Sequence, residues 1–452
     1  MNHLSTSVIG SVARRTVHDT QFSLTARTRA SHAFTDTIGC IVSGVAEAPV
    51  VMARQALSAP AGGPCAVIGG GGAPAGHAAL INATAAHAQD YDDTFGPLSG
   101  HASAVLVPAL LGVAGLVSTS GMRLTEAYLI GLEAQALFGR GLNPGHYAAG
   151  WHATSTVGAI GASIGTAWLL GLDEEGMTRA ASLAVSMASG LKGQFGTPAK
   201  PLHAGLAARN AVEAALLAAT GLTGRPDIIE HAMGLEKVCA GKGEKWAQIM
   251  MSPDAPHSIE SIGLTPKRYP CCAATHDTLD RLLDLRTLHG FDAADVERVD
   301  IALDAVAMDN LSYMEPVNGM QARFSMTYCA AVTLLQGVPR LSDFTQEAVE
   351  EPARRRLLSL IHPHLCGAEE SAVPRHRVTV RLKDGRTLRS GRTAEASPPA
   401  RTFNENDRRD KYLDCCSRHL DRSDADTLYE RLLTLEKQPD LAFIACAFGK
   451  AR

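Results

Sequence analysis

The feature that most constrains this chain is the stretch 78–222, in which segments rich in alanine and glycine alternate with short polar loops. Small side chains let helices approach closely, so the stretch predicts a packed group of buried helices. Its longest apolar run, 104–117, holds Pro108 and is shorter than the ~20 residues that a membrane-spanning helix needs. We therefore expect a buried helix there and no membrane partner.

Charge and cysteine content exclude several classes of protein. The 42 basic and 46 acidic residues give a net charge of -4 and form no block of one sign, which argues against a nucleic-acid partner. The ten cysteines include no Cys-x-x-Cys pair, and His362-Pro-His364 near Cys366 lacks the usual zinc spacing. The N-terminus lacks a basic region followed by an apolar core. We predict a cytoplasmic protein with neither a metal site nor a disulfide framework.

A glycine-rich segment that follows residue 65 resembles a nucleotide-binding motif. Gly70, Gly72 and Ala75 fit a G-x-G-x-x-A pattern after a strand-like run, which is typical of dinucleotide binding. Pro74 interrupts the turn, however, and no strand-helix-strand unit surrounds it. We interpret the segment as a tight loop and predict no nucleotide cofactor.

The composition changes near 264–276, where two prolines bracket Lys267 and Arg268, and this change predicts a domain junction. Residues 296–306 and 376–382 alternate apolar and polar side chains and predict strands, with a hairpin turn at Asp384-Gly385. Helical patterns cover 324–335 and 344–361, and the proline-containing segment 394–401 would return the chain to the first domain.

These patterns predict a mainly α fold with two domains, as expected for 452 residues. A large all-helical domain would contain both chain ends, 1–265 and 396–452. A smaller α+β lid domain would cover 266–395.

Polar side chains crowd residues 87–104, between two apolar segments. If the first helix ends near Thr94, then His87, Asp90, Tyr91 and Thr94 share one face. Ser103 would cap the next helix. The residues alone allow either a functional site or a capped helix-turn-helix with an exposed acidic corner.

Three polar loops carry a basic group beside a predicted helix start: His101, His152 after Trp151, and Lys200 with His203. Helix N-termini present unpaired N–H groups and a positive dipole end, so such loops favour an anion, and a polycarboxylate would fit. The alternative is ordinary capping, which is common in helical proteins.

Six motifs resemble, in order, those of the MmgE/PrpD family. They are His87-Ala-Gln-Asp90-Tyr-Asp-Asp-Thr94, Gly100-His101-Ala-Ser103, Gly150-Trp-His152-Ala-Thr-Ser-Thr, Ala199-Lys200-Pro-Leu-His203-Ala-Gly, Lys267-Arg-Tyr-Pro-Cys-Cys and Ala322-Arg-Phe-Ser-Met-Thr-Tyr328. The family includes 2-methylcitrate dehydratase, cis-aconitate decarboxylase and iminodisuccinate epimerase. The stretches Gly145-His-Tyr147-Ala-Ala-Gly-Trp-His152, Phe195-Gly-Thr197 and Tyr313-Met-Glu-Pro most resemble the epimerase branch.

The resemblance implies a homodimer without metal or organic cofactor, and a site at the domain junction for a small di- or tricarboxylate. Position by position, it implies the following site residues: Asp90, Thr94, His101, His152, Lys200 and Lys267. Tyr313 is the counterpart that we assign to a family tyrosine in the lid. One departure is that many members have a Gly-x-Pro-x-Asn-Pro motif after the lid hairpin, where this chain reads Ala-Ser-Pro-Pro-Ala-Arg-Thr-Phe-Asn404.

Chemistry of this kind removes a proton from a carbon next to a carboxylate or imine. Fixed cations lower the barrier by stabilising the developing negative charge, a role that suits Lys200 and Lys267. His101 and His152 are the expected acid and base, because imidazole titrates near neutral pH. Asp90 would orient a histidine or a lysine. Tyr147 would serve the opposite face of the carbon, and Thr94, His203, Arg268 and Tyr313 would contact the substrate.

Three functions follow as hypotheses. We predict an epimerase of the iminodisuccinate type, with a lyase of the 2-methylcitrate dehydratase or cis-aconitate decarboxylase type as the alternative. A non-catalytic helical protein that binds anions is the third. In that last case the contact of Asp90 with the lysines would be a buried ion pair that only ties the domains together.

Overall fold

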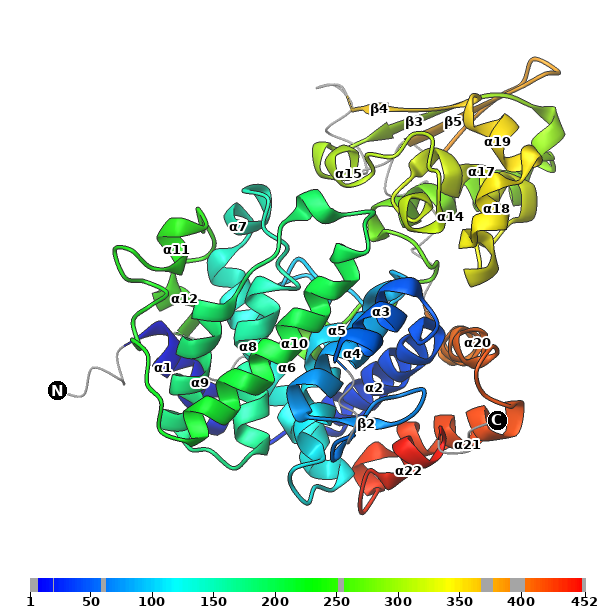
Figure 1. Cartoon of the computed structure of the whole chain (residues 1–452). Helices are drawn as coiled ribbons and strands as arrows, with labels where there is room; N and C mark the ends of the chain where they lie inside the picture. Colours follow the sequence, from blue (N-terminus) through cyan, green and yellow to red (C-terminus); the bar gives the residue numbers. More distant parts are fainter. Residues whose placement is uncertain are drawn as a thin grey trace.

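The computed structural model describes residues 7–18, 20–57, 62–250, 256–366, 377–390 and 403–448. Helices dominate these residues, and strands form only a two-stranded and a four-stranded sheet, so the predicted mainly α fold is confirmed (Figure 1). Among the described residues no single helix is long and apolar enough to span a membrane. The pair α2 and α3, bent by 85° at its junction, meets the length and composition test only when taken together.

A helical region contains most of the chain. Its longer helices are α1 (Val8–His18), α2 (Leu24–Gly44), α3 (Ala48–Leu57), α4 (Ala75–Ala88), α5 (Ala102–Ala114), α6 (Gly121–Leu142), α8 (Thr156–Leu169), α9 (Glu174–Met187), α10 (Ala199–Ala219), α20 (Glu405–Cys416) and α21 (Arg422–Leu433). Side chains cap the N-termini of three of these helices. Ser23, Ser120 and Asp173 accept hydrogen bonds from backbone N–H groups in the first turns of α2, α6 and α9. The short strands β1 (Cys65–Ala66) and β2 (Gly72–Ala73) enclose the glycine-rich turn, as the tight-loop interpretation expects.

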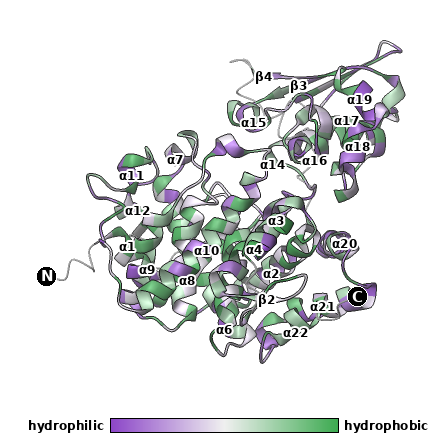
Figure 2. Ribbon diagram, viewed as in Figure 1, coloured by the Kyte–Doolittle hydropathy of each residue, from purple (hydrophilic) through white to green (hydrophobic). Residues whose placement is uncertain are grey.

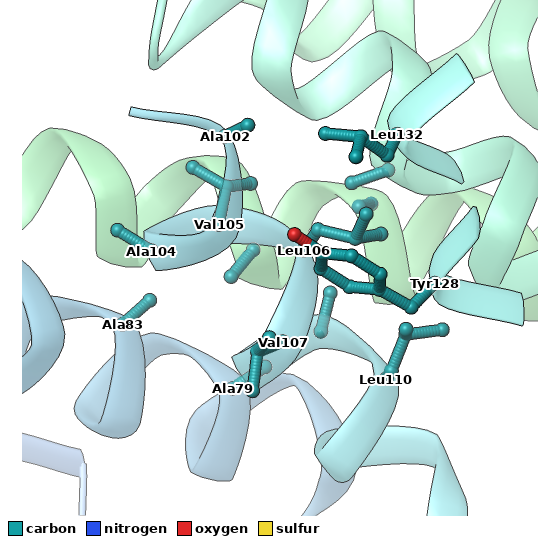
Figure 3. Packing of buried hydrophobic residues seen from close by; sticks show 14 of the residues in the cluster. Ala79, Ala83, Ala102, Ala104, Val105, Leu106, Val107, Leu110, Tyr128 and Leu132 are labelled. Carbon is teal, nitrogen blue, oxygen red and sulfur yellow. The ribbon is translucent and has the colours of Figure 1, made fainter. Parts of the chain in front are cut away.

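Small residues bring the central helices close together, as the alanine and glycine content predicts. Figure 3 shows Ala79 of α4 beside Val107 of α5, and Leu106 and Leu110 of α5 beside Tyr128 of α6. A Cβ atom added to Gly165 of α8 would lie 3.0 Å from the Cα atom of Gly131 in α6. In Figure 2 the central α4 is mostly hydrophobic, whereas the peripheral α20 is mostly hydrophilic. Residue size therefore sets the helix spacing at the centre of the molecule.

A sheet region follows at 269–388, with its own apolar core. The strands β3 (Val296–Leu303), β4 (Ile361–Leu365), β5 (Arg377–Leu382) and β6 (Thr387–Arg389) form a sheet in the order β4-β3-β5-β6. Strand β3 is parallel to β4 and antiparallel to β5, and β5 and β6 form the predicted hairpin. The helices α14 (Ala273–His289) and α17 (Met326–Gln336) pack against the strands, and α19 (Pro352–Leu358) packs against α17 (Figure 1).

One predicted helix in the sheet region is confirmed only in part. Residues 344–361 form two short helices, α18 (Gln346–Glu350) and α19, and then enter β4. Pro352 begins the second helix, since a proline disfavours helical backbone at the preceding residue. The strand that follows, Ile361–Leu365, was not predicted from the sequence.

The parts of the chain before and after the sheet region form one common core in the helical region, because α20 and α21 pack against α2. This arrangement agrees with a helical domain built from both chain ends. The boundaries at 265/266 and 395/396 stay a prediction, and the proposed return segment 394–401 lies outside the described residues.

Candidate active site

The loop 89–101 organises the site. Helix α4 ends at Ala88, so the prediction that it continues to Thr94 is wrong. Asp90 ends it physically, because its backbone adopts a left-handed conformation with φ of 50°, a position that glycine or asparagine commonly fills. Beyond it, Thr94 and Thr265 exchange two backbone hydrogen bonds of 2.9 Å. Among the four residues expected on one helix face, only His87 is helical.

Asp90 gathers the two lysines at the meeting of the helical and sheet regions. Its carboxylate accepts hydrogen bonds from Lys200 Nζ and, at 2.8 Å, from Lys267 Nζ. Lys267 Nζ also donates to the backbone oxygen of Asp90 at 2.8 Å. Exposed fractions of only 2–3% for these three residues make this a buried cluster of two ammonium groups and one carboxylate, with one net positive charge.

The charges of this cluster are mutually stabilised. Burial disfavours the charged form of Asp90, but Lys200 and Lys267 hold the pKa of its carboxyl well below the usual range. Burial likewise opposes the charged form of Lys267, and Asp90 and Asp92 outweigh it and raise the pKa of that ammonium group. The expected orienting role of Asp90 is therefore directed at the lysines and not at a histidine.

Aromatic rings flank Lys200 from both regions. Its Nζ atom lies 5.5 Å from the ring centre of Phe195 and 5.0 Å from that of Phe324. Beside them is a cavity of about 10 Å³, lined among others by His87, Asp90, Lys200 and Phe324. That volume is room for about one water molecule.

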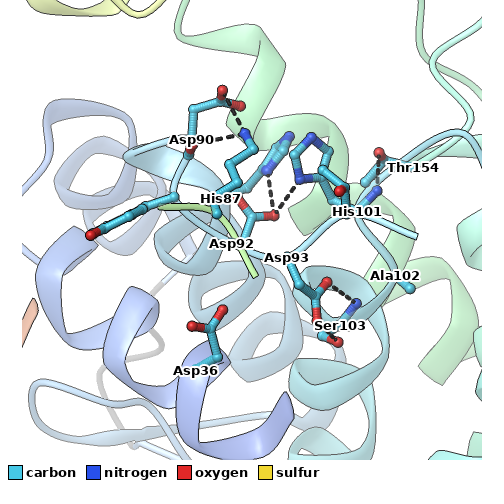
Figure 4. Close-up of polar contacts among 12 residues, drawn as sticks. Asp36, His87, Asp90, Asp92, Asp93, His101, Ala102, Ser103 and Thr154 are labelled. Carbon is cyan, nitrogen blue, oxygen red and sulfur yellow. Dashed lines mark hydrogen bonds and ion pairs between the residues drawn. The ribbon is translucent and has the colours of Figure 1, made fainter. Parts of the chain in front are cut away.

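Asp92 makes a second, different cluster. Its Oδ2 atom lies 2.8 Å from Nδ1 of His87 and 3.1 Å from Nδ1 of His101, and the two imidazole rings meet edge to face at 4.5 Å (Figure 4). Asp92 and His87 are fully buried, and the side chain of His101 is 12% exposed. His87 Nδ1 donates a hydrogen bond to this oxygen, whereas Nδ1 of His101 lies close to it without hydrogen-bond geometry. The negative carboxylate favours hydrogen on both Nδ1 atoms, which leaves each Nε2 with a lone pair.

Burial keeps both imidazoles neutral. It lowers the pKa of His87 to about 3 and also lowers that of His101, and Asp92 only partly offsets it. Burial opposes ionisation of Asp92 as well, but His101 and His87 hold its pKa well below the usual range. Neutral His101 can therefore act as a base through Nε2.

Ligand atoms of His87, Asp92 and His101 lie within 4.8 Å of one another, close enough for a metal ion. The hydrogen bond from His87 to Asp92 and the electrostatic contact of His101 with the same oxygen account for this arrangement. The expectation of no metal stays a prediction.

Asp93 faces away from both clusters. Its carboxylate accepts hydrogen bonds from the hydroxyl and the backbone N–H of Ser103, whose hydroxyl lies 2.8 Å from that of Tyr128. Burial raises the pKa of Asp93 to about 7, and Asp36 and Asp92 add to the effect. The predicted capping role of Ser103 is wrong, because α5 begins at Ala102, one residue earlier.

His152 and His203 face each other, with their Nδ1 atoms 3.2 Å apart. His152 precedes α8 and stacks on His87, with ring centres 5.8 Å apart, and His203 lies in the first turns of α10. His101 is the N-cap of α5, and Lys200 is the second residue of α10. The basic groups therefore lie at helix starts, as predicted.

Two predicted tyrosines bridge the regions. The hydroxyl of Tyr147 is 3.1 Å from Nδ2 of Asn310, and burial raises the pKa of that hydroxyl. The hydroxyl of Tyr313 donates to the backbone oxygen of Phe195 at 2.9 Å. Tyr147 can thus serve only as a proton donor, and Tyr313 is tied to the loop that precedes Lys200.

Two predicted substrate contacts are placed less favourably. Arg268 follows Lys267 but points to a separate cavity of about 500 Å³, and its NH1 atom lies 3.6 Å from Asp280. The hydroxyl of Thr94 lies 3.5 Å from the backbone oxygen of Thr265, which is a weak hydrogen bond. The structure thus separates Arg268 from the Asp90 cluster.

Three residues around the site were not assigned a role from the sequence. His87 and Asp92 lie within the first motif, and Arg323 lies within the last one. Arg323 donates to the backbone oxygen of Gln89 at 3.1 Å and to its side chain, which fixes the sheet region on the loop 89–101. The motifs contained this signal, but the direction of each side chain required the structure.

A helical protein with buried lysines, imidazoles and carboxylates at the meeting of two regions is built for acid–base chemistry on an anion. Residues 13–247 match the model of the MmgE/PrpD N-terminal domain, and residues 269–436 match that of the MmgE/PrpD C-terminal domain. The chain therefore belongs to the MmgE/PrpD family and is an enzyme of that family, as we predicted.

Several characterised relatives are similar over most of the chain. Cis-aconitate decarboxylase from Homo sapiens is 26% identical over 389 residues, which cover 82% of this chain and 79% of the relative. The Mus musculus enzyme of the same name is 28% identical over 392 residues, 81% of this chain and 76% of the relative. The Aspergillus terreus enzyme is 25% identical over 361 residues, 70% of this chain and 69% of the relative. These comparisons do not support the predicted epimerase branch.

Proposed function

We propose that the protein is a cofactor-independent lyase that removes carbon dioxide from a small unsaturated tricarboxylate such as cis-aconitate. The observation that carries this proposal is the fixed cluster of Lys200 and Lys267 on Asp90 beside neutral imidazoles. The names of the relatives favour decarboxylation over the predicted epimerisation. Epimerisation of an iminodisuccinate-type substrate and dehydration of a 2-methylcitrate-type substrate remain the alternatives.

Decarboxylation needs stabilised negative charge and one proton. Loss of carbon dioxide leaves an electron pair that spreads over the allylic carbons and a neighbouring carboxylate, and protonation of carbon completes the reaction. The net positive charge of the Asp90 cluster is present before reaction and stabilises the carboxylate that receives the charge. Neutral His101 and His152 flank the same place and can hold or deliver the proton.

Binding also requires an opening movement. The cavity of about 10 Å³ beside Asp90 and Lys200 admits one water molecule, whereas a tricarboxylate is many times larger. Phe324 and Arg323 of the sheet region line this cavity opposite Lys200. We infer that the sheet region moves away from α10 when substrate enters.

Turnover in heavy water tests the proposal. Purified protein is incubated separately with cis-aconitate, 2-methylcitrate and iminodisuccinate, and carbon dioxide release and carbon-bound deuterium are measured. The expected result is carbon dioxide from cis-aconitate with one deuterium in the product. Deuterium exchange without carbon dioxide would favour the epimerase, and loss of water would favour the dehydratase.

Matched variants link the activity to the site. Lys267→Met is expected to lower kcat by about 10²- to 10³-fold, as for other lost electrostatic contacts to a transition state. Lys383→Met, which changes an exposed lysine of the sheet region bonded to the Ala294 oxygen, should leave kcat unchanged. Binding of polycarboxylates without any turnover would instead favour the non-catalytic anion-binding hypothesis.

A further inference from the structure

The pair of His152 and His203 has features that a purely structural contact does not need. The Nδ1–Nδ1 distance of 3.2 Å requires that one ring carries hydrogen on Nδ1 and that the other accepts it. Neither Nε2 atom has a hydrogen-bond partner among the described residues. Nε2 of His87 is shielded from solvent and lacks a partner, whereas the Nε2 atoms of His152 and His203 are not shielded in this way. Each ring therefore keeps one nitrogen available for a second proton.

The two rings lie at different depths. His152 is 2% exposed and packs between His87 and Phe195, next to the Asp90 cluster. His203 is 8% exposed, one turn after Lys200 on α10. The pair thus connects the interior of the site to a more accessible position.

The backbone holds the pair in place. The N–H of His152 donates to the oxygen of Gly190 at 3.0 Å, and the hydroxyl of Ser155 donates to the backbone oxygen of His203 at 3.1 Å. Burial, with Lys200 adding to it, lowers the pKa of both imidazoles, so both are neutral near pH 7. A neutral imidazole can accept a proton at one nitrogen and release one from the other.

We propose that His203 and His152 relay protons from solvent to the reacting carbon, an inference that rests on the proposed function. When carbon dioxide has left, the carbon takes the proton of His152 Nε2, and the electron pair forms the new C–H bond. The proton between the two Nδ1 atoms moves from His203 to His152, and His203 Nε2 takes a proton from water or buffer. One solvent proton is consumed for each carbon dioxide released. Each ring regains its starting tautomer after product release, when it loses the proton on one nitrogen to water and takes a proton from water on the other nitrogen.

His101 is less suited to this relay. Its Nδ1 atom is directed at Asp92, and the Asp92 cluster continues only to His87, whose Nε2 is enclosed. His101 and His152 therefore have separate tasks, in which the first holds a fixed tautomer and the second exchanges protons with solvent through His203.

Replacement of His203 separates a relay from a structural role. His203→Gln keeps a hydrogen-bonding side chain but cannot pass a proton, and His203→Ala leaves space for a small base. Both are expected to lower kcat for cis-aconitate by about 10²-fold with little change in KM. Imidazole in the buffer should restore His203→Ala with saturable dependence on its concentration. His77→Gln changes a histidine whose Nδ1 atom is hydrogen-bonded to the backbone oxygen of Leu57. This variant should keep the wild-type kcat, and added imidazole should not change it.

The outcomes distinguish this inference from the proposed function. Wild-type kcat in His203→Gln would overturn the relay and leave the proposed function standing. A loss in folded His203→Ala that imidazole does not restore would show a structural role and would also overturn it. A wild-type protein that releases no carbon dioxide would overturn the proposed function and with it the relay.

Discussion

Asp90 and Asp92 are separated by one residue and both are buried, yet they bind different partners. Asp90 binds two ammonium groups, whereas Asp92 accepts a hydrogen bond from neutral His87 and makes an electrostatic contact with neutral His101. The first cluster has a fixed positive charge, and the second fixes tautomers without adding a cation. The same side chain therefore serves two purposes, and the partners that the fold supplies decide which one.

The backbone explains the division. The left-handed conformation of Asp90 ends α4 and directs its carboxylate to α10 and Lys267. Two residues later the chain directs Asp92 back toward His87, which lies in the last turn of α4. Because a carboxylate takes the charge state that its neighbours stabilise, substitution at the two positions should have different consequences.

Asp90→Asn is expected to have the largest effect. It leaves two ammonium groups buried side by side, so it should destabilise the fold by about 3–5 kcal/mol and lower kcat by about 10²- to 10³-fold. The pKa of Asp90 is depressed, so its contribution is present above ~3.9 and is lost as pH falls through the folded-state value. Urea unfolding between pH 3 and pH 8, together with carbon dioxide release, measures both effects.

The control for Asp90→Asn is Asp227→Asn, which removes an exposed ion pair with Arg225. It should shift neither the urea midpoint nor kcat. Wild-type stability and turnover in Asp90→Asn would contradict the role of the cluster.

Asp92→Asn is expected to have a smaller effect on stability and a specific effect on pH dependence. Loss of tautomer control at His101 should lower kcat by about 10²-fold. Asp92 raises the pKa of His101 against the larger effect of burial, so its removal should shift the basic group of the kcat/KM profile to lower pH. A profile that keeps its position would exclude the His101–Asp92 pairing during turnover.

The helices could be predicted from sequence because their signals are local. The periodicity of α1, α2 and α5 and the turn Asp384-Gly385 determine structure without distant partners. Strand β4 could not be predicted in this way, because its parallel pairing with β3 joins residues some sixty positions apart in the chain, as in Val299 with Ile361. The end of α4 was misjudged for the same reason, since Thr94 pairs with Thr265.

Prediction of the site from the sequence is limited in the same way, because the direction of each side chain depends on the fold. The motifs named Asp90, Lys200 and Lys267, and the structure brings these three together. They also suggested Arg268, but consecutive residues of an extended segment point to opposite sides, so Lys267 faces Asp90 and Arg268 faces Asp280. Asp92 was overlooked because no sequence pattern states where a loop carboxylate points.

Asp93→Asn gives the smallest effect on activity and completes the comparison of the loop carboxylates. The folded-state pKa of about 7 is above the ordinary value of ~3.9, so this carboxyl contributes stability that is full below ~3.9 and is lost as pH rises through 7. Asparagine resembles the protonated carboxyl and cannot ionise. The free energy of unfolding of the variant relative to that of the wild type should therefore rise by on the order of 2 kcal/mol between pH 5 and pH 8. The kcat should not change. Urea midpoints across this range measure the difference. Equal pH dependence in both proteins would show that Asp93 is ionised in the fold, and a loss of activity would place it with Asp90 and Asp92.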